Sequence, residues 1–431
     1  MSLKHKFIYI TCIVFLCSFI LFNTFAFAVS DATAYVWSNQ SKKLETAETS
    51  VGLNSSSATV TDNPLALDCG AACLIEQNSG LIIYDYNMHE KLRPASVTKV
   101  MTLLLIMEAI DRGEIKLDDR VPCSEKARKM GGSQIWLNET ERLTVNEMIK
   151  AICVVSANDC TVAMAEYIGG SEEAFVAKMN ERAKELGMND TTFKNSHGID
   201  EDGHLTSAHD IAVMSRELSK NHPKIHEYTT IWMDTLRDGK SQLVNTNKLV
   251  RFYDGCTGLK TGSTSLAGFN LSATATRNNL KLIGVVVHAS SGANRFDDAR
   301  KVLDYGFANF ACKEIMPKEN VVEKIKIEKS NLEEVEVIVQ NQVSALMKKG
   351  DEKNIRTEII YIDNISAPLE YRAKVGVLNC YLNDELIKSE DLVVNQEVKR
   401  KNFGNYLNEL LKFSYNLRKR KEIENFKFNF I

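Results

Sequence analysis

The spacing of apolar and polar residues predicts strands and helices in the first part of the chain. Two short apolar runs, 72–77 and 81–86, flank Asn78-Ser79-Gly80 and predict a β-hairpin. A run that is apolar on all sides follows Pro94, so we expect a buried helix there. Four more segments have helical spacing or capping signals: 145–155, 159–168, 171–187 and 208–219.

Strand-like spacing returns after this block of helices. The segments 258–264, 268–276 and 280–288 have the composition of strands, and Arg277-Asn278-Asn279 joins the last two. Residues 294–307 then return to helical spacing. Strands, a helical block, more strands and a final helix predict an α+β domain over 64–318, with one antiparallel sheet and helices on it.

The helical spacing disappears from about residue 320. Short alternating or β-branched runs with turns between them predict a small all-β sandwich domain over 319–398. The five runs are 321–327, 335–339, 357–362, 375–382 and 385–394.

The beginning of the chain differs from this body. Residues 1–28 start with Lys4 and Lys6, continue in an apolar run and end in Ala26-Phe27-Ala28, which is the pattern of a cleaved secretory signal. An uncleaved membrane anchor is the alternative, and both predict that the body is exported. Residues 29–63 are rich in Ser, Thr, Ala and Asn without apolar periodicity, which is typical of a disordered spacer.

The last segment, 399–431, combines apolar residues at helical spacing with many basic residues. A basic amphipathic helix of this kind can lie on an anionic membrane surface, but it has no 18-residue apolar stretch with which to span one. The alternative is a helix that packs on the second domain with its charges in solvent. The apolar positions are Phe403, Tyr406, Leu407, Leu410, Leu411 and Leu417, and the basic ones include Lys401, Lys412, Arg418, Lys419, Arg420 and Lys421.

Charge and cysteine content exclude two classes of protein. The net charge is −3, but residues 1–28 carry +2 and residues 399–431 carry +6, so the body between them carries −11. A body this acidic is not a nucleic-acid binder, whose signature is a basic face. Of the ten cysteines, eight follow the signal segment. Their number permits disulfides in an exported chain, but it is far too low for a disulfide scaffold, and their pairing stays open.

Ser96 and Lys99 are the first residues that suggest chemistry. They are three residues apart on a helix, so their side chains lie on one face within reach of each other. A serine hydroxyl needs a neighbouring base to become a good nucleophile, and burial or a nearby cation turns a lysine into a base by lowering its pKa. Lys99 is the only charged residue between Arg93 and Glu108. The alternative is structural, with a serine cap and a lysine that reaches solvent.

Two further motifs follow at wide spacing. Ser156-Ala157-Asn158 lies in a helix–helix connection, where a hydroxyl and an amide can pass protons and hold a substrate amide; turn and cap roles are the alternative. Lys260-Thr261-Gly262 lies in a strand-like run, where the glycine lets another backbone approach closely. Its lysine and threonine offer a cation and a hydroxyl to a carboxylate. An exposed edge strand protected by its lysine is the alternative.

Together, Ser-x-x-Lys, Ser-x-Asn and Lys-Thr-Gly are the motif set of penicillin-binding proteins and β-lactamases. The stretches RPASVTKVMT, VVSANDCTVAMAE, NSHGID…GHLTSAHD and GLKTGSTSLAGFNLSATA closely resemble the low-molecular-mass penicillin-binding proteins of serine peptidase family S11. The resemblance covers about residues 65–400 and implies a β-lactamase/transpeptidase-like fold. It also implies a serine-type D-alanyl-D-alanine carboxypeptidase that acts on peptidoglycan stem peptides and is inhibited by β-lactams.

The resemblance implies a role for each matching residue. Ser96 attacks the carbonyl between the two terminal D-alanines, Lys99 accepts its proton, and the backbone N–H groups of Ser96 and Ser263 form the oxyanion hole. Some relatives have His or Tyr where this chain has Ser263, which bears on rate and specificity. The implied catalytic set is Ser96, Lys99 and Ser156, and the implied substrate-binding set is Asn158, Lys260, Thr261, Gly262, Ser263 and Arg295.

Other functions remain as alternatives. His197, His204, His209 and Asp210 suggest a zinc site, but neither His-Glu-x-x-His nor another clean ligand spacing is present, so we expect no metal and no cofactor. A β-lactam sensor or scaffold that is acylated without turnover, and a DD-endopeptidase that cuts crosslinks, share the motifs. The spacer, second domain and tail disfavour a β-lactamase. We expect an exported protein at the membrane or cell wall, with stem peptides as partners and no nucleic acid.

Overall fold

The structure, a computed structural model, describes residues 63–428. A five-stranded antiparallel sheet lies at the centre of its first domain, in the order β2–β1–β9–β8–β7. Strands from the two ends of this domain meet in the sheet, where Ala71 of β1 pairs with Val287 of β9. The α+β prediction is confirmed. The strands are β1 (Ala71–Glu76), β2 (Ile82–Tyr86), β7 (Cys256–Thr264), β8 (Gly268–Arg277) and β9 (Leu280–Ala289).

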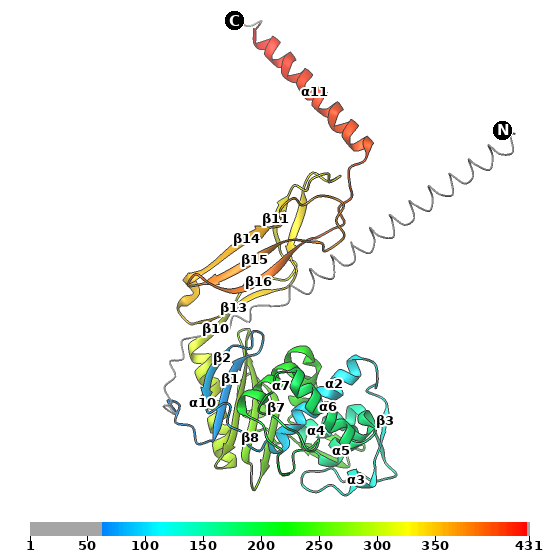
Figure 1. Ribbon diagram of the computed structural model, residues 1–431, viewed down its shortest axis with the longest axis vertical. Helices are drawn as coiled ribbons and strands as arrows, with labels where there is room; N and C mark the ends of the chain where they lie inside the picture. Colours follow the sequence, from blue (N-terminus) through cyan, green and yellow to red (C-terminus); the bar gives the residue numbers. More distant parts are fainter. Residues whose placement is uncertain (1–62, 429–431) are drawn as a thin grey trace, which may run out of the picture. The chain divides into compact units, whose positions relative to one another are not determined.

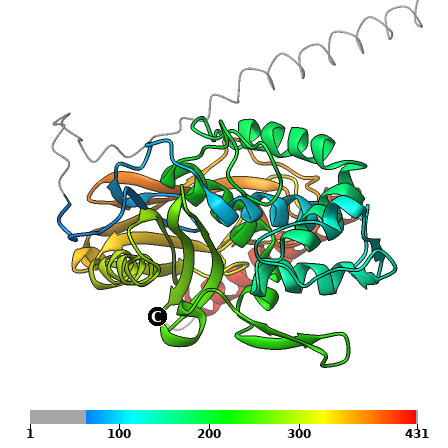
Figure 2. The ribbon, with the colours of Figure 1, turned by 90° about the horizontal axis from the view of Figure 1, so that it is seen from below.

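Helices cover both faces of this sheet (Figure 1). On one face lies α10 (Gly292–Asn309), which Figure 2 shows nearly along its axis beside the strands. On the other face lies α7 (Ala208–Asn221). Because successive side chains of a strand point to opposite faces, Val285 and Val287 of β9 enter the core on the α7 side, while Val286 enters the core on the α10 side.

The predicted buried helix is α2 (Lys99–Asp111), which packs against α7. Its side chains are buried around most of the helix, so a helix without a polar face is stable only inside this core. One turn of 3₁₀ helix, η1 (Ala95–Thr98), comes before it and contains Ser96. The rest of the helical block consists of α4 (Val145–Val154), α5 (Asn158–Gly169) and α6 (Glu172–Glu185).

Several short connecting elements were not predicted, because three or four residues are too few for a hydrophobic pattern to stand out. The hairpin of β5 and β6 is one example, and the pair of β3 and β4 is another. The short elements are β3 (Arg120–Pro122), α3 (Glu125–Arg128), β4 (Arg142–Thr144), η2 (Pro223–Ile225), α8 (His226–Thr229), β5 (Met233–Leu236), β6 (Ser241–Val244) and α9 (Leu249–Phe252).

The second domain is β-rich, as predicted, and has its own apolar core. One sheet has the order β11–β12–β16–β15–β14, and β10 and β13 form a separate pair. The strands β10 and β13 were not predicted, and β10 lies in the segment assigned to the first domain. The elements are β10 (Phe310–Met316), β11 (Val321–Ile325), β12 (Val335–Val339), β13 (Val343–Lys348), η3 (Asp351–Asn354), β14 (Ile355–Tyr361), β15 (Lys374–Leu382) and β16 (Glu385–Val394).

The tail contains one helix, α11 (Phe403–Phe428). None of the helices within 63–428 is long and apolar enough to cross a membrane. The eight cysteines in this part of the chain are all unpaired. The predicted signal segment and the spacer, apart from Asn63, lie outside the described residues, so both stay predictions, as do the predicted domain boundaries.

Candidate active site

Ser96 and Lys99 are in direct contact at the start of α2. The Lys99 Nζ lies 2.9 Å from the Ser96 Oγ, and the Lys99 side chain is fully buried. Burial lowers the pKa of Lys99 well below its usual value, and the nearby positive charge of Lys260 lowers it further, while Asp159 opposes the shift. A lysine in these surroundings is neutral more readily than a lysine in water, which a general base requires.

The other partners of Lys99 set the direction of its lone pair. Its Nζ donates to the Asn158 Oδ1 and to the His197 backbone carbonyl, each at 2.7 Å. A neutral amine has two N–H bonds and one lone pair, and the two carbonyl oxygens take both N–H bonds. The lone pair therefore points to the remaining neighbour, the hydroxyl of Ser96. This geometry suits proton transfer from serine to lysine.

The second motif lies where α4 ends and α5 begins. Ser156 has a left-handed backbone (φ +63°), and its buried Oγ has no hydrogen-bond partner within the described residues. Asn158 is fixed by Gly131, whose carbonyl accepts from its Nδ2 (2.7 Å), and by Ser133, whose carbonyl accepts from its backbone N–H (2.7 Å). These bonds turn the Asn158 side-chain oxygen toward Lys99.

The third motif runs along the edge strand β7, beside the turn that contains Ser96. A Cβ added at Gly262 would lie 2.8 Å from the backbone nitrogens of Ser96 and Val97, so only glycine permits this approach. Lys260 is buried, and its Nζ donates to the Thr261 carbonyl (3.0 Å). Burial, with help from the charge of Arg295, lowers the pKa of Lys260 to about 7, although Cys153 opposes the shift. The alternative, an exposed edge strand protected by its lysine, is therefore ruled out by the burial of this side chain.

Arg295 of α10 reaches the same strand. Its Nη1 donates to the Gly262 carbonyl (3.2 Å), and its guanidinium lies over the rings of Phe269 and Phe296. Its buried Nε has no partner within the described residues, and burial lowers its pKa to about 10. Within 63–428, no carboxylate forms an ion pair with Arg295 or Lys260, so the partly buried guanidinium of Arg295 and the buried amine of Lys260 lack a counter-charge.

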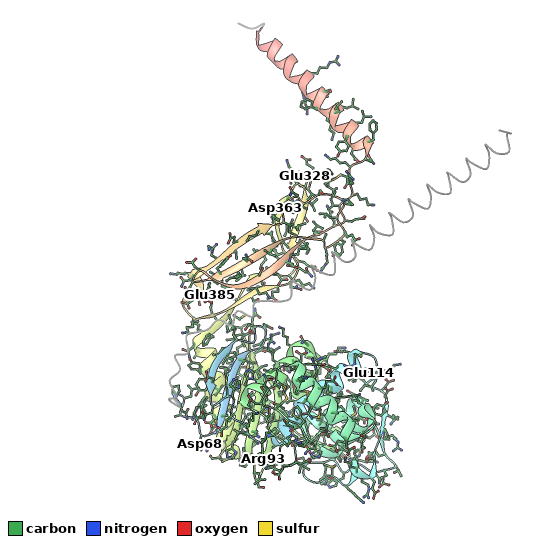
Figure 3. The ribbon with its side chains drawn as sticks, in the orientation of Figure 1. Asp68, Arg93, Glu114, Glu328, Asp363 and Glu385 are labelled. Atoms are coloured by element: carbon green, nitrogen blue, oxygen red, sulfur yellow. The ribbon has the colours of Figure 1, made fainter. Side chains whose placement is uncertain are left out.

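The chain that leads to Ser96 is hydrogen-bonded to the sheet. Arg93, labelled in Figure 3, accepts a hydrogen bond through its carbonyl from the Asn270 Nδ2 of β8 (2.8 Å). Ala95 has a left-handed backbone (φ +48°), and its carbonyl accepts from the Thr98 hydroxyl (2.8 Å). A Cβ on Gly198 would lie 1.9 Å from this same Ala95 carbonyl, so the glycine of NSHGID is needed for close packing.

Two of the histidines considered as zinc ligands, His197 and His204, make other contacts. His204 accepts the Lys194 N–H through Nδ1 (3.1 Å), so its proton lies on Nε2, which donates to the Thr98 Oγ1 (2.8 Å). The backbone carbonyl of His197 accepts a hydrogen bond from Lys99. No signal in the sequence indicated this contact, because it does not involve the histidine side chain. Among the residues that the structure describes, no three His, Cys, Asp or Glu side chains are arranged to hold a metal ion.

An antiparallel sheet with a helical block, and the three motifs meeting between them, define the class of serine enzymes that includes penicillin-binding proteins and β-lactamases. Comparisons with known proteins give the family. The family model of D-alanyl-D-alanine carboxypeptidases matches residues 57–291, and the model of the C-terminal domain of penicillin-binding protein 5 matches residues 310–400. The chain belongs to this S11 family of serine-type D-alanyl-D-alanine carboxypeptidases, which are extracytoplasmic, penicillin-binding enzymes of the cell wall.

Individual relatives agree with this assignment. The chain is 42% identical over 347 residues, covering 80% of this chain and 89% of the relative, to the D-alanyl-D-alanine carboxypeptidase DacF of Bacillus subtilis. Penicillin-binding protein 5 of Haemophilus influenzae has a similar structure, with a TM-score of 0.65, 28% identity and coverage of 78% of this chain and 98% of that chain. Penicillin-binding protein D2 of Listeria monocytogenes, solved with ampicillin bound, is also similar. Its TM-score is 0.52 and its identity 30%, over 56% of this chain and 99% of that chain.

Proposed function

We propose that Ser96 is the nucleophile and Lys99 the general base, and that the substrate is the D-Ala-D-Ala end of a peptidoglycan stem peptide. The observation that carries this proposal is the contact of the buried Lys99 amine with the Ser96 hydroxyl, while two carbonyl oxygens occupy its N–H bonds. A preformed pair of this kind transfers a proton without reorganisation of solvent.

The reaction takes place in two steps. The Ser96 Oγ forms a bond to the carbonyl carbon of the penultimate D-alanine, its proton moves to Lys99, and the backbone N–H groups of Ser96 and Ser263 receive the negative charge on the carbonyl oxygen. The C–N bond then breaks, and the leaving amine takes a proton through Ser156. Water hydrolyses the acyl-enzyme ester and restores Ser96. The free, buried hydroxyl of Ser156 supports its role as the proton relay.

The terminal carboxylate binds to the cations of β7 and α10. Lys260 is buried and Arg295 is partly buried, and neither has a counter-charge among the described residues, so an anionic ligand stabilises the charged form of both. The hydroxyl of Thr261, which now donates to Thr246 (2.7 Å), stands on the same strand. A substrate with a free terminal carboxylate satisfies these groups, and a β-lactam with its own carboxylate binds in the same way and acylates Ser96.

The test combines turnover with the location of the adduct. The purified protein should release free D-alanine from a pentapeptide ending in D-Ala-D-Ala, with no loss on addition of a chelator. Penicillin should add one adduct, which mass spectrometry should locate in the tryptic peptide 92–99 that contains Ser96. An adduct elsewhere would overturn the assignment of the nucleophile. D-alanine release that a chelator abolishes would support zinc, and cleavage of crosslinked dimers alone would support an endopeptidase.

We also propose that α11 binds an anionic membrane surface on the outer side of the membrane, after removal of residues 1–28. The apolar side chains of Phe403, Leu410 and Phe413 on this helix are strongly exposed, which is costly in water and favourable in a membrane interface. Basic residues flank them in the sequence.

Removal of residues 399–431 should release the protein from membranes without loss of activity. The full chain should sediment with phosphatidylglycerol vesicles, and the chain ending at residue 398 should stay in the supernatant with D-alanine release within about twofold of the full chain, because anionic lipids attract a basic helix. Neutral phosphatidylcholine vesicles are the control. Equal sedimentation of the two chains would contradict the role of the helix.

A further inference from the structure

The carbonyl that orients Lys99 belongs to a loop that is distant from it in sequence. His197 lies between α6 and α7, 98 residues from Lys99, and its position depends on what holds the loop. Ser196, the preceding residue, is bonded on two sides. Its carbonyl accepts from the Thr102 hydroxyl of α2 (2.6 Å), and its own N–H and hydroxyl both point to Glu172.

Glu172 is the first residue of α6, and its carboxylate is almost fully buried. The Glu172 Oε1 accepts from the Ser196 N–H (3.0 Å) and from the Ser196 hydroxyl (2.6 Å). Its Oε2 forms an ion pair with the Lys126 Nζ (2.9 Å). Burial raises the pKa of Glu172, but these hydrogen bonds and Lys126 outweigh it, so the pKa is lowered and the group is a carboxylate.

The ring of His197 faces the same carboxylate. Its Nδ1 accepts the Ile199 N–H (3.1 Å), so the proton of the neutral ring lies on Nε2, which is 3.6 Å from the Glu172 Oε1. Glu172 therefore borders both residues of the 196–197 segment. The side of this segment opposite Glu172 holds Lys99 through the His197 carbonyl.

We propose that Glu172 is a positioning residue for Lys99, which acts through Ser196 and His197 to hold the His197 carbonyl against the Lys99 amine. The inference rests on the proposed role of Lys99 as the base. Without the carboxylate, the segment has no acceptor for the Ser196 N–H and hydroxyl, the carbonyl moves, and water reaches Lys99. The amine then becomes harder to deprotonate, because the burial that lowers its pKa is reduced.

Glu172→Ala tests the proposal through the pH dependence of acylation. The second-order rate constant for a fluorescent penicillin should fall at least tenfold at pH 6, and the deficit should shrink as the pH rises and Lys99 loses its proton. Of the other charged groups that face Lys99, Lys260 and Asp159 form no contact with Glu172, whereas the ring of His197 does. Burial lowers the pKa of His197 to about 4, so its ring is neutral from pH 6 upward and does not produce the expected pH dependence. A ratio that is constant with pH, or equal to one, would overturn the proposal.

Two other variants distinguish the positioning of Lys99 by Glu172 from an effect of the ion pair with Lys126. Glu173 is the exposed neighbour of Glu172; it pairs with the same Lys126 Nζ (2.8 Å) but does not contact the loop. The Glu173→Gln variant removes the charge of this pair and should be acylated at the wild-type rate. Glu172→Gln keeps an acceptor oxygen for Ser196 and should stay within about threefold of the wild type. A loss in Glu173→Gln as large as that in Glu172→Ala would assign the effect to Lys126 and overturn the proposal.

Ser196→Ala serves if Glu172→Ala does not fold. It removes only the hydroxyl bond to Glu172, so it should slow acylation about three- to tenfold at pH 6 with the same recovery at higher pH, and a wild-type rate at every pH would overturn the proposal. The wild-type protein is measured alongside. If the wild type is not acylated at Ser96, the proposed function fails; if it is acylated and the variants match it, only the role of Glu172 fails.

Discussion

Lys99→Arg is expected to lower the rate of acylation by penicillin about a hundred- to ten-thousandfold, because a general base contributes about 10²–10⁴ and arginine cannot act as one. Arginine keeps the positive charge and the donors of lysine, but its guanidinium is never deprotonated in proteins. The buried amine of Lys99 meets Ser96 and two carbonyl oxygens, and arginine has no lone pair to offer the hydroxyl. Raising the pH should not restore the acylation rate of the variant.

The measurement is the second-order rate of labelling by a fluorescent penicillin, together with circular dichroism to establish folding. Lys129→Arg, the same substitution on an exposed side chain, is the matched control and should react like the wild type. Labelling of a folded Lys99→Arg protein within tenfold of the wild-type rate would show that another group takes the proton from Ser96.

Asp159→Ala should reduce the free energy of unfolding by about 3–5 kcal/mol, since each buried donor left without an acceptor costs about 1–3 kcal/mol. The fully buried carboxylate of Asp159 accepts the backbone N–H groups of Ile135 (3.1 Å), Leu137 (3.0 Å) and Cys160 (2.9 Å). These bonds attach segment 131–137 to the start of α5. The same segment supplies the carbonyls that orient Asn158, so activity should fall as well.

Urea unfolding followed by tryptophan fluorescence measures this loss, and Trp136 lies within the attached segment. Asp159→Asn keeps one acceptor oxygen and should lose about half as much. Asp297→Ala, on the surface of α10, removes only an exposed pair with Arg300 and should cost less than about 1 kcal/mol. If Asp159→Ala unfolded at the same urea concentration as Asp297→Ala, the attachment of the segment would not contribute to stability.

The chemical groups of the site were predictable because each has a recognisable residue type in a recognisable pattern. Lys99 is the only charged residue between Arg93 and Glu108 in an apolar run, and the structure buries its side chain. The segment 280–288 was predicted as a strand, and in the structure it is β9, whose alternate side chains enter two different cores. Gly262 was predicted to permit a close approach, and the approach is to the backbone of Ser96 and Val97.

Other strands could not be predicted, because their sequences show too little alternation of apolar and polar residues or are too short. β13 has alternating buried positions, but its partner β10 is a half-exposed strand that continues directly from α10, so its sequence does not separate it from the helix. The strands β3 to β6 are three or four residues long, and only their pairing reveals them.

By itself, the sequence determined which side chains are available for chemistry and where most of the longer helices and strands lie. Only the tertiary structure decided how those side chains are oriented. The His197 carbonyl that takes an N–H of Lys99, and the Gly131 and Ser133 carbonyls that turn Asn158, are backbone groups. Every residue has such a carbonyl, so no residue type marks the ones that matter, and their directions follow from contacts between segments distant along the chain.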